Sequence, residues 1–216
     1  DVARGKLSAG EEALDDFILI KGDGYPTYNF AHIVDDFEMG VTHIMRADEF
    51  VASTPKFLSL YDALEIPYPT FVTLPPIMRA DGKKKLGKRD GAKDILEYRT
   101  DGYLPKAMMN FLALIGWNPG GDRELFFTEQ ELTEAFTLEK IQRSGGAFNE
   151  EKLMWMNKQF INQLSPDEQY EYVLDSIAFR VKELAQYSEE RVRRAVSTFL
   201  ERAQYKKEIR DASEGG

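Results

Sequence analysis

The feature that most restricts the fold is an alternation of strand and helix signals in the first part of the chain. Short apolar runs at residues 17–20, 41–46 and 70–78 predict three strands. Two helical patterns lie between them, and in the first the apolar residues fall one helical turn apart (Phe30, Ile33, Val34 and Phe37). Three strands separated by two helices within about sixty residues predict βαβ units and therefore a parallel sheet.

The chain after Lys93 has a different pattern. Amphipathic stretches follow one another, among them FTEQELTEAF, whose second residue is Thr128, and NEEKLMWMNKQFI, which begins at Asn149, and each named residue is a good helix cap. Two long helical patterns follow at residues 166–186 and 188–211. The predicted fold class is therefore α/β followed by all-α.

Composition excludes several classes of site. The chain has 43% hydrophobic and 30% charged residues and a formal net charge of −9, values typical of a globular protein. Because it has no cysteine, disulfides, thiolate zinc sites and a cysteine nucleophile are excluded, and His32 and His43 are its only imidazoles. No window reaches the ~18 apolar residues of a membrane span, and no signal peptide opens the chain. We expect a cytoplasmic protein without a membrane partner.

One segment departs from this acidity. Between Arg79 and Lys93 the chain carries seven cationic side chains and two carboxylates, a local net charge of +5. Such a run is either a solvated surface loop or a loop that neutralises a polyphosphate. Ligands of parallel sheets bind beyond the carboxyl ends of the strands, and Arg46 ends one predicted strand while this basic loop follows another. By position alone, a binding loop and a solvated surface loop are equally good interpretations.

Five stretches, in order, resemble a bacterial-type glutamyl-tRNA synthetase, a class I aminoacyl-tRNA synthetase. They are DGYPTYNFAHIVDDFEMGVTHIMRADEF, STPKFLSLYDAL, KKLGKRDGA, GYLPKAMMNFLALIGWNPGGD and FNEEKLMWMN, and the likeness runs from Arg4 to Ile161. The resemblance implies the second half of a Rossmann-like catalytic domain at residues 1–83. It further implies a phosphate loop and stem-contact region at 84–164, and the beginning of a helical anticodon-binding domain at 165–216.

The resemblance assigns an ATP site. KLGKR stands where class I synthetases carry their Lys-Met-Ser-Lys-Ser type loop, with Gly87 in place of the usual serine. Lys88 would be the main phosphate ligand, because cations must gather where pyrophosphate is expelled. The implied catalytic residues are Lys85, Lys88 and Arg89. The implied ATP-binding residues are Glu49, Ile77, Lys85, Leu86, Gly87, Lys88 and Arg89.

The resemblance also assigns a glutamate site. Arg46 matches the arginine that holds the side-chain carboxylate, a task suited to a guanidinium fork. The rest of the implied glutamate site is Tyr28, Asn29, Phe30, Ala31 and His32, although some relatives have asparagine at the His32 position. Without the resemblance, Arg46 is equally well an ion-paired arginine at a strand end, and His32 a structural histidine.

The implied reaction joins glutamate to ATP as glutamyl-adenylate and passes the acyl group to the 3′ end of tRNA(Glu). ATP is a substrate, Mg²⁺ comes with it, no protein metal ligand is implied, and no zinc is expected in this segment. The family's His-Ile-Gly-His-like signature does not occur in these residues, and the sequence begins at Asp1. We therefore expect an internal piece of the enzyme that is inactive alone and self-associates through an exposed sheet edge, whereas the full-length enzyme is monomeric.

Three alternatives remain open. A glutaminyl-tRNA synthetase is the nearest rival within the class, although the wording of KLGKRDGA favours the glutamyl enzyme. A non-catalytic tRNA-binding module would bind RNA without dependence on ATP or glutamate, and the piece could also be inert by itself. A related enzyme that glutamylates a tRNA nucleoside lacks the helical C-terminal half, which argues against it here.

Overall fold

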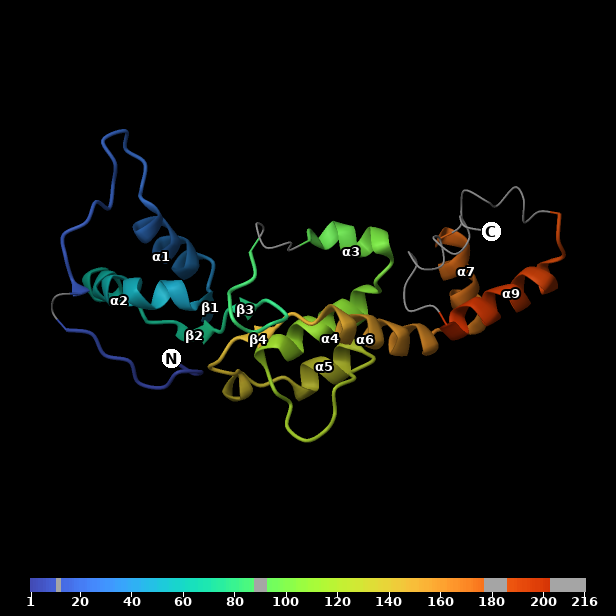
Figure 1. Ribbon diagram of the computed structural model, residues 1–216. Coiled ribbons are helices and arrows are strands. Elements are labelled where there is room, and N and C mark those ends of the chain that lie inside the picture. Colours follow the sequence, from blue (N-terminus) through green and yellow to red (C-terminus); the bar gives the residue numbers. More distant parts are fainter. Residues whose placement is uncertain (11–12, 88–92, 177–185, 203–216) are drawn as a thin grey trace. The chain divides into compact units, whose positions relative to one another are not determined.

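The computed structural model describes residues 1–10, 13–87, 93–176 and 186–202 (Figure 1). The chain forms two compact units. The first consists of Asp1–Pro76 with Thr137–Gly145, and the second of Ile77–Phe136 with Gly146–Gly216. The three predicted functional regions, at residues 1–83, 84–164 and 165–216, do not coincide with these two units, and they stay a prediction.

The first unit contains the parallel strand pair that the sequence predicts. Strands β1 (His43–Ala47) and β2 (Thr70–Leu74) run parallel. In their register His43 lies opposite Thr70, and Ala47 lies opposite Leu74. Helix α1 (Tyr28–Glu38) precedes β1, and a 3-10 helix, η2 (Asp48–Ser53), and helix α2 (Thr54–Ala63) connect the two strands. The two α-helices pack together around a cluster of buried side chains, namely Ile33, Phe57, Leu60 and Tyr61.

The predicted strand at residues 17–20 is wrong. In the structure this run belongs to an irregular arm, the long blue loop of Figure 1, with only an isolated antiparallel bridge between Ile20 and Pro26. Lys21 N–H donates to the Tyr25 carbonyl at 2.8 Å, and Thr27 N–H donates to the Leu19 carbonyl at 2.7 Å. The Gly-Asp-Gly turn therefore folds the apolar run back on its own neighbours rather than onto the sheet.

The predicted strand at residues 70–78 is divided in two. It ends as β2 at Leu74, and after Pro75 and Pro76 a short strand, β3 (Ile77–Met78), begins in the second unit. There β3 pairs in parallel with β4 (Gly146–Ala147), which the sequence patterns did not predict. Two successive prolines interrupt the strand because neither has an N–H group to donate to a ladder.

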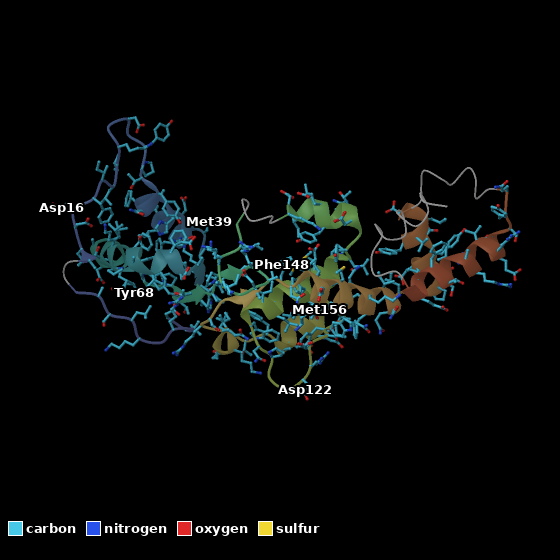
Figure 2. The ribbon with its side chains drawn as sticks, viewed as in Figure 1. Asp16, Met39, Tyr68, Asp122, Phe148 and Met156 are labelled. Carbon is cyan, nitrogen blue, oxygen red and sulfur yellow. The ribbon has the colours of Figure 1, made fainter. Side chains whose placement is uncertain are left out.

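The second unit is built around a pair of contacting helices. Its helices up to residue 162 are α3 (Ile95–Asp101), α4 (Pro105–Gly116), α5 (Glu129–Ala135) and α6 (Glu150–Asn162). Helices α4 and α6 pack around Met156, which is fully buried and is labelled in Figure 2, and Phe148 packs edge-on against the ring of Phe111. Both predicted caps are confirmed, because the side chains of Thr128 and Asn149 accept hydrogen bonds from helix N–H groups.

The helical C-terminal part has its own core. Helices α7 (Pro166–Ser176) and α9 (Glu189–Arg202) meet α6 in a cluster of buried residues, namely Ile161, Tyr172, Val173, Val192, Val196 and Leu200. One further element between α5 and α6, the short 3-10 helix η4 (Leu138–Lys140), is part of the first unit and not of this core. The predicted helices at 166–186 and 188–211 are confirmed over these spans; Gln186 and Ser188 are not helical, and residues 177–185 and 203–211 lie outside the described residues. An α/β part followed by an all-helical part is therefore correct.

Candidate functional site

Arg46 lies near the end of β1 among aromatic rings from three different elements. Its guanidinium carbon is 5.2 Å from the ring centre of Phe50, 5.7 Å from that of Phe57 and 5.9 Å from that of Tyr28. Phe50 comes from η2, Phe57 from α2 and Tyr28 from α1. Rings within about 6 Å of a guanidinium attract the cation and restrict the orientation of its plane.

A carboxylate completes the surroundings of Arg46. Asp36 Oδ2 on α1 lies 3.7 Å from an Nη atom of Arg46, and the two side chains are 24% and 21% exposed. The distance makes an ion pair rather than a hydrogen bond, and this oxygen has no hydrogen-bond partner in the described part of the chain. Asp36 is therefore a counter-ion of Arg46, but it does not take up the N–H donors of the guanidinium in a hydrogen bond.

His32 has a structural environment beside Arg46. Its Nδ1 lies 2.8 Å from the Tyr28 carbonyl oxygen, so this nitrogen carries the proton and donates. The ring stacks on Tyr28 with centres 4.9 Å apart and meets Phe57 edge-on at 4.6 Å. Burial lowers the pKa of His32, and the Tyr28 carbonyl only partly offsets this effect. The His32 ring thus contacts Tyr28 twice, by a hydrogen bond to its carbonyl and by stacking on its ring, and both contacts hold Tyr28 in place.

The structure brings only part of the predicted glutamate segment to Arg46. Tyr28 and His32 share the aromatic cluster described above, whereas Asn29, Phe30 and Ala31 lie half-buried along α1. Among the described residues no hydrogen bond or ring contact joins these three to Arg46.

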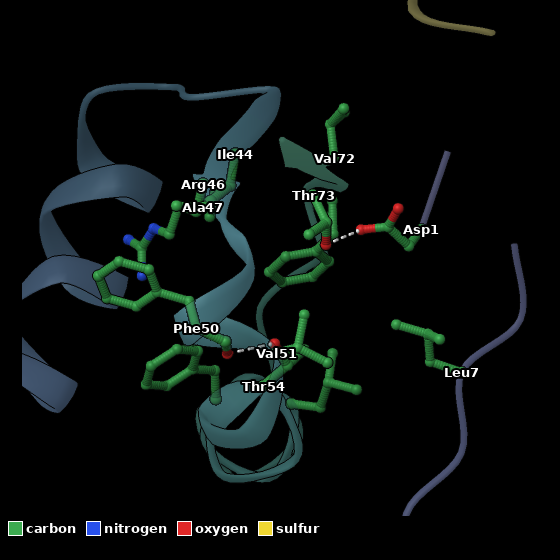
Figure 3. Close-up of a pocket in the computed structure, with 13 residues that line it drawn as sticks. Asp1, Leu7, Ile44, Arg46, Ala47, Phe50, Val51, Thr54, Val72 and Thr73 are labelled. Carbon is green, nitrogen blue, oxygen red and sulfur yellow. Dashed lines mark hydrogen bonds between the residues drawn. The ribbon is translucent and has the colours of Figure 1, made fainter. Parts of the chain in front are cut away.

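A cavity of about 140 Å³ opens beside Arg46 (Figure 3). Arg46, Phe50 and Thr73 lie in its wall, together with apolar side chains from β1, β2, η2 and α2. Thr73 Oγ1 donates to Asp1 Oδ2 at 2.6 Å, and Thr54 Oγ1 donates to the Phe50 carbonyl at 3.0 Å, two bonds drawn in Figure 3. The cavity is thus small and largely apolar, and its charged lining residues are Arg46 and Asp1, whose carboxylate accepts the hydrogen bond from Thr73.

Glu49, predicted to contact the nucleotide, has a different location in this unit. It is exposed on η2, three residues after Arg46, and is not among the residues that line the cavity.

The basic loop begins as a hairpin in the second unit. Leu86 N–H donates to the Ile77 carbonyl and Arg79 N–H donates to the Lys84 carbonyl, each at 2.8 Å. An antiparallel bridge joins Met78 to Lys85 between these two bonds. The predicted ATP residues Ile77, Lys85, Leu86 and Gly87 therefore belong to one local structure.

The last two predicted residues of this loop, Lys88 and Arg89, lie outside the described residues. Lys93, the last cation of the basic segment, is already paired. Its Nζ lies 2.7 Å from Glu150 Oε1 and 3.5 Å from Asp101 Oδ2. The hairpin lysines Lys83 and Lys84 are exposed. Of the seven cations of this segment, Lys93 is therefore already held by carboxylates of the second unit.

Metal ligands and membrane spans can be assessed for the residues that the structure describes. Within them, no group of three or more histidine, aspartate or glutamate side chains is placed to hold a metal ion. No helix among them is both long and apolar enough to cross a bilayer.

Sequence reasoning missed several neighbours of Arg46. Phe50 and Phe57 reach it from elements that follow β1, and no periodicity connects them to it. Asp36 carried a usable signal, since it stands one helical turn after His32 and therefore on the same face of α1.

Curated proteins similar to this chain include glutamate–tRNA ligases. Glutamate–tRNA ligase of Clostridium botulinum is 45% identical over 174 residues, which are 81% of this chain and 36% of the relative. Glutamate–tRNA ligase of Desulfitobacterium hafniense is 41% identical over 167 residues, which are 77% of this chain and 34% of the relative. The chain thus spans about a third of the length of these curated relatives.

Solved structures and a family profile agree. A glutamate tRNA ligase from Elizabethkingia meningosepticum, crystallised in complex with its amino acid, superposes with a TM-score of 0.86 at 32% identity, covering 99% of this chain and 45% of that one. A glutamate-tRNA synthetase from Elizabethkingia anophelis gives the same TM-score and identity, with coverage of 99% and 46%. The profile of the catalytic domain of class I tRNA synthetases (E and Q) matches residues 1–155. The chain therefore belongs to this family of class I tRNA synthetases.

Proposed function

We propose that this chain serves ATP-dependent ligation of glutamate to tRNA(Glu), the activity for which its relatives are named. The observation that carries the proposal is the guanidinium of Arg46, held among three rings in the wall of a small cavity. A cation restrained in this way is suited to a carboxylate that enters an apolar chamber.

Arg46 would read the side chain of the amino acid. A guanidinium presents two parallel N–H donors that match the two oxygens of a carboxylate, which accepts both hydrogen bonds. The amide of glutamine would turn an NH₂ group toward one of these donors and lose that bond. A site built for hydrogen bonds rejects a substrate that leaves them unmade, so this geometry favours glutamate over glutamine. Tyr28 would restrict the orientation of the Arg46 guanidinium, with His32 acting through Tyr28.

The hairpin would present the phosphate-binding residues. In the activation step an α-carboxylate oxygen of glutamate attacks the α-phosphorus of ATP, the bond to the oxygen bridging toward the β-phosphorus breaks, and pyrophosphate leaves. Lys85, Lys88 and Arg89 would stabilise the charge that develops on the leaving group. Ile77 and Leu86 would pack near the nucleotide, and Glu49 would accept a hydrogen bond from the nucleotide. Gly87 would let the backbone approach the phosphates. Mg²⁺ would come with ATP, held largely by the phosphates.

In the second step a hydroxyl of the terminal ribose of tRNA(Glu) attacks the acyl carbon, and AMP leaves. The region at 84–164 would contact the acceptor stem, and the helices from residue 165 would begin the anticodon-binding part. The reaction needs no covalent protein nucleophile, because positioning and charge stabilisation suffice. Such an enzyme works in the cytoplasm, where protein synthesis takes place.

The test is glutamate-dependent exchange of pyrophosphate into ATP with tRNA present. It is run on the chain alone and on the chain mixed with the part of a relative that it does not match. Exchange that depends on glutamate, exceeds the exchange with glutamine and falls at least about a hundredfold in Lys88→Ala supports the proposal. Lys83→Ala is the matched control, because Lys83 is an exposed cation in the turn of the same hairpin.

Other outcomes of this assay select the rivals. Preference for glutamine would indicate a glutaminyl-tRNA synthetase. Binding of tRNA that is indifferent to ATP and glutamate, without exchange, would indicate a non-catalytic RNA-binding module.

We also propose that the chain by itself associates through strand edges, while the full-length enzyme is monomeric. In the described part of the chain the sheet of β1 and β2 has two strands, and each strand has one edge without a neighbouring strand. Size-exclusion chromatography with light scattering over a range of concentrations tests this expectation. A chain that remains monomeric at the highest concentration would contradict it.

A further inference from the structure

Lys93 is surrounded by groups that satisfy its charge. Its Nζ donates to Glu150 Oε1 at 2.7 Å and lies 3.5 Å from Asp101 Oδ2. The same ammonium lies 5.2 Å from the ring centre of Tyr98. Burial lowers the pKa of Lys93, but the hydrogen bond and the two carboxylates outweigh it, so the pKa lies above its usual value. The side chain is therefore charged and fully engaged within the second unit.

Lys93 and its partners lie at the C-terminal end of the basic loop, and the N-terminal end of the loop is held nearby in the same unit. The hairpin that starts the basic loop is attached through β3 to β4, and Phe148 N–H donates to the Met78 carbonyl at 2.9 Å. At the other end of the loop, Lys93 is attached to Glu150, the first residue of α6. Both ends of the loop are thus fastened to one short stretch of chain, residues 146–150.

We propose that Lys93 is a positioning residue that fixes the C-terminal end of the phosphate-binding loop on helix α6, and is not one of the cations that meet the phosphates. The inference rests on the proposed function, because it assumes that the loop binds ATP. Holding both ends on the same stretch restricts where the loop's cations can lie, and a displacement of about 1 Å is enough to weaken a charge-stabilising contact severely.

Glu150→Gln distinguishes this role from direct phosphate binding by the sign of its effect. If Lys93 met the phosphates, removal of its carboxylate partner would free the ammonium and tighten ATP binding. If Lys93 is an anchor, the same substitution loosens the end of the loop and weakens ATP binding. Asp101 remains as a second partner in this variant, so the effect should be smaller than that of Lys93→Met.

The experiment measures the dissociation constant of MgATP by calorimetry on the chain mixed with the added part of a relative, and the KM values for ATP and glutamate in the exchange assay of the same mixture. We expect Lys93→Met to weaken ATP binding about tenfold and Glu150→Gln by about threefold, with the KM for glutamate unchanged. The double variant should be no weaker than Lys93→Met, because both changes break the same pair. Lys93→Arg, which keeps the cation, should retain most of the affinity.

The pair of Lys152 and Glu124 is the matched control. It is also an ion pair of α6, with Nζ and Oε1 2.5 Å apart, and its side chains are 38% and 47% exposed against 34% and 44% for Lys93 and Glu150. Lys152→Met and Glu124→Gln should leave ATP binding unchanged. A purely structural role for Lys93 would lower the unfolding temperature without separating the two KM values.

The outcomes separate the two proposals. Tighter ATP binding in Glu150→Gln, additive effects in the double variant, or effects equal to those of the control pair would each overturn the anchor role while leaving the proposed function standing. Failure of the wild-type chain, mixed with the added part, to bind ATP or to support glutamate-dependent exchange would overturn the proposed function, and the anchor role with it.

Discussion

Gly146 occupies a position where a single methyl group should destabilise the second unit. A Cβ at this residue would collide with the carbonyl oxygen of Ile115 and lie 2.8 Å from its carbonyl carbon, where ordinary contact starts at 3.4 Å. Ile115 is in the last turn of α4, so its carbonyl belongs to helix backbone and cannot swing aside as a side chain would. To relieve the contact with the carbonyl oxygen, one of the two backbones must move by roughly 1 Å or more in a close-packed interior.

The magnitude follows from two costs. Forcing extra volume into a packed site costs about 1–3 kcal/mol, and a disturbed backbone hydrogen bond of the pairing between β3 and β4 about 1 kcal/mol more. We expect Gly146→Ala to reduce the free energy of unfolding by about 3 kcal/mol and the unfolding temperature by about 6–12 °C. Tryptophan fluorescence reports this directly, because both tryptophans, Trp117 and Trp155, belong to the second unit.

Gly22→Ala makes the same chemical change where a Cβ would meet no atom within 4 Å, so it should leave this transition unchanged. A Gly146→Ala variant that unfolds within about 0.5 kcal/mol of wild type would refute the reasoning, because it would show that α4 and β4 do not approach each other closely.

Four further predictions concern the site and the helices. Arg46→Lys, which keeps the charge but loses the fork, should raise the KM for glutamate about tenfold or more and reduce the preference over glutamine in the exchange assay; an unchanged preference would remove Arg46 from substrate recognition. The pKa of His32 is lowered by burial, so its unfolded form binds a proton first, and the stability present above about pH 6.5 should be lost as the pH falls; urea unfolding between pH 7.5 and 5 should show less of this loss in His32→Asn, and an equal loss would contradict it. Asn110 is fully buried and accepts from Phe126 N–H at 2.7 Å, so Asn110→Ala should cost about 3 kcal/mol in chemical unfolding, whereas a cost near zero would mean that water replaces these bonds. Asp94→Ala removes the capping box of α3 and should cost about 1 kcal/mol, seen as faster amide exchange in that helix and nowhere else.

Features that depend on neighbouring residues could be predicted from the sequence. The caps at Thr128 and Asn149 were recognisable because each is a short polar side chain before an acidic first turn, and such a side chain bonds to N–H groups two or three residues away. The parallel pairing of β1 and β2 was predictable because a helix between two strands returns the chain in the same direction.

Strands with distant or absent partners could not be predicted. The run at residues 17–20 is as apolar as a strand, yet its backbone bonds go to its own turn. The two residues of β4 show no pattern, and they form a strand only because β3, nearly seventy residues earlier, lies beside them. Pairing of this kind depends on which backbones meet in space.

The sequence by itself determined the family, the helix and strand order from α1 to β2, and the presence of Arg46, Tyr28 and the basic loop. These follow from local hydrogen bonding, from helical and strand periodicity, and from motif order along the chain. Only the tertiary structure decided that Arg46 lies among Phe50, Phe57 and Asp36, and that Lys93 is paired with Glu150. The physical reason is that the environment of a charge is set by every element packed against it, and those elements are brought together by the burial of side chains far apart in the sequence.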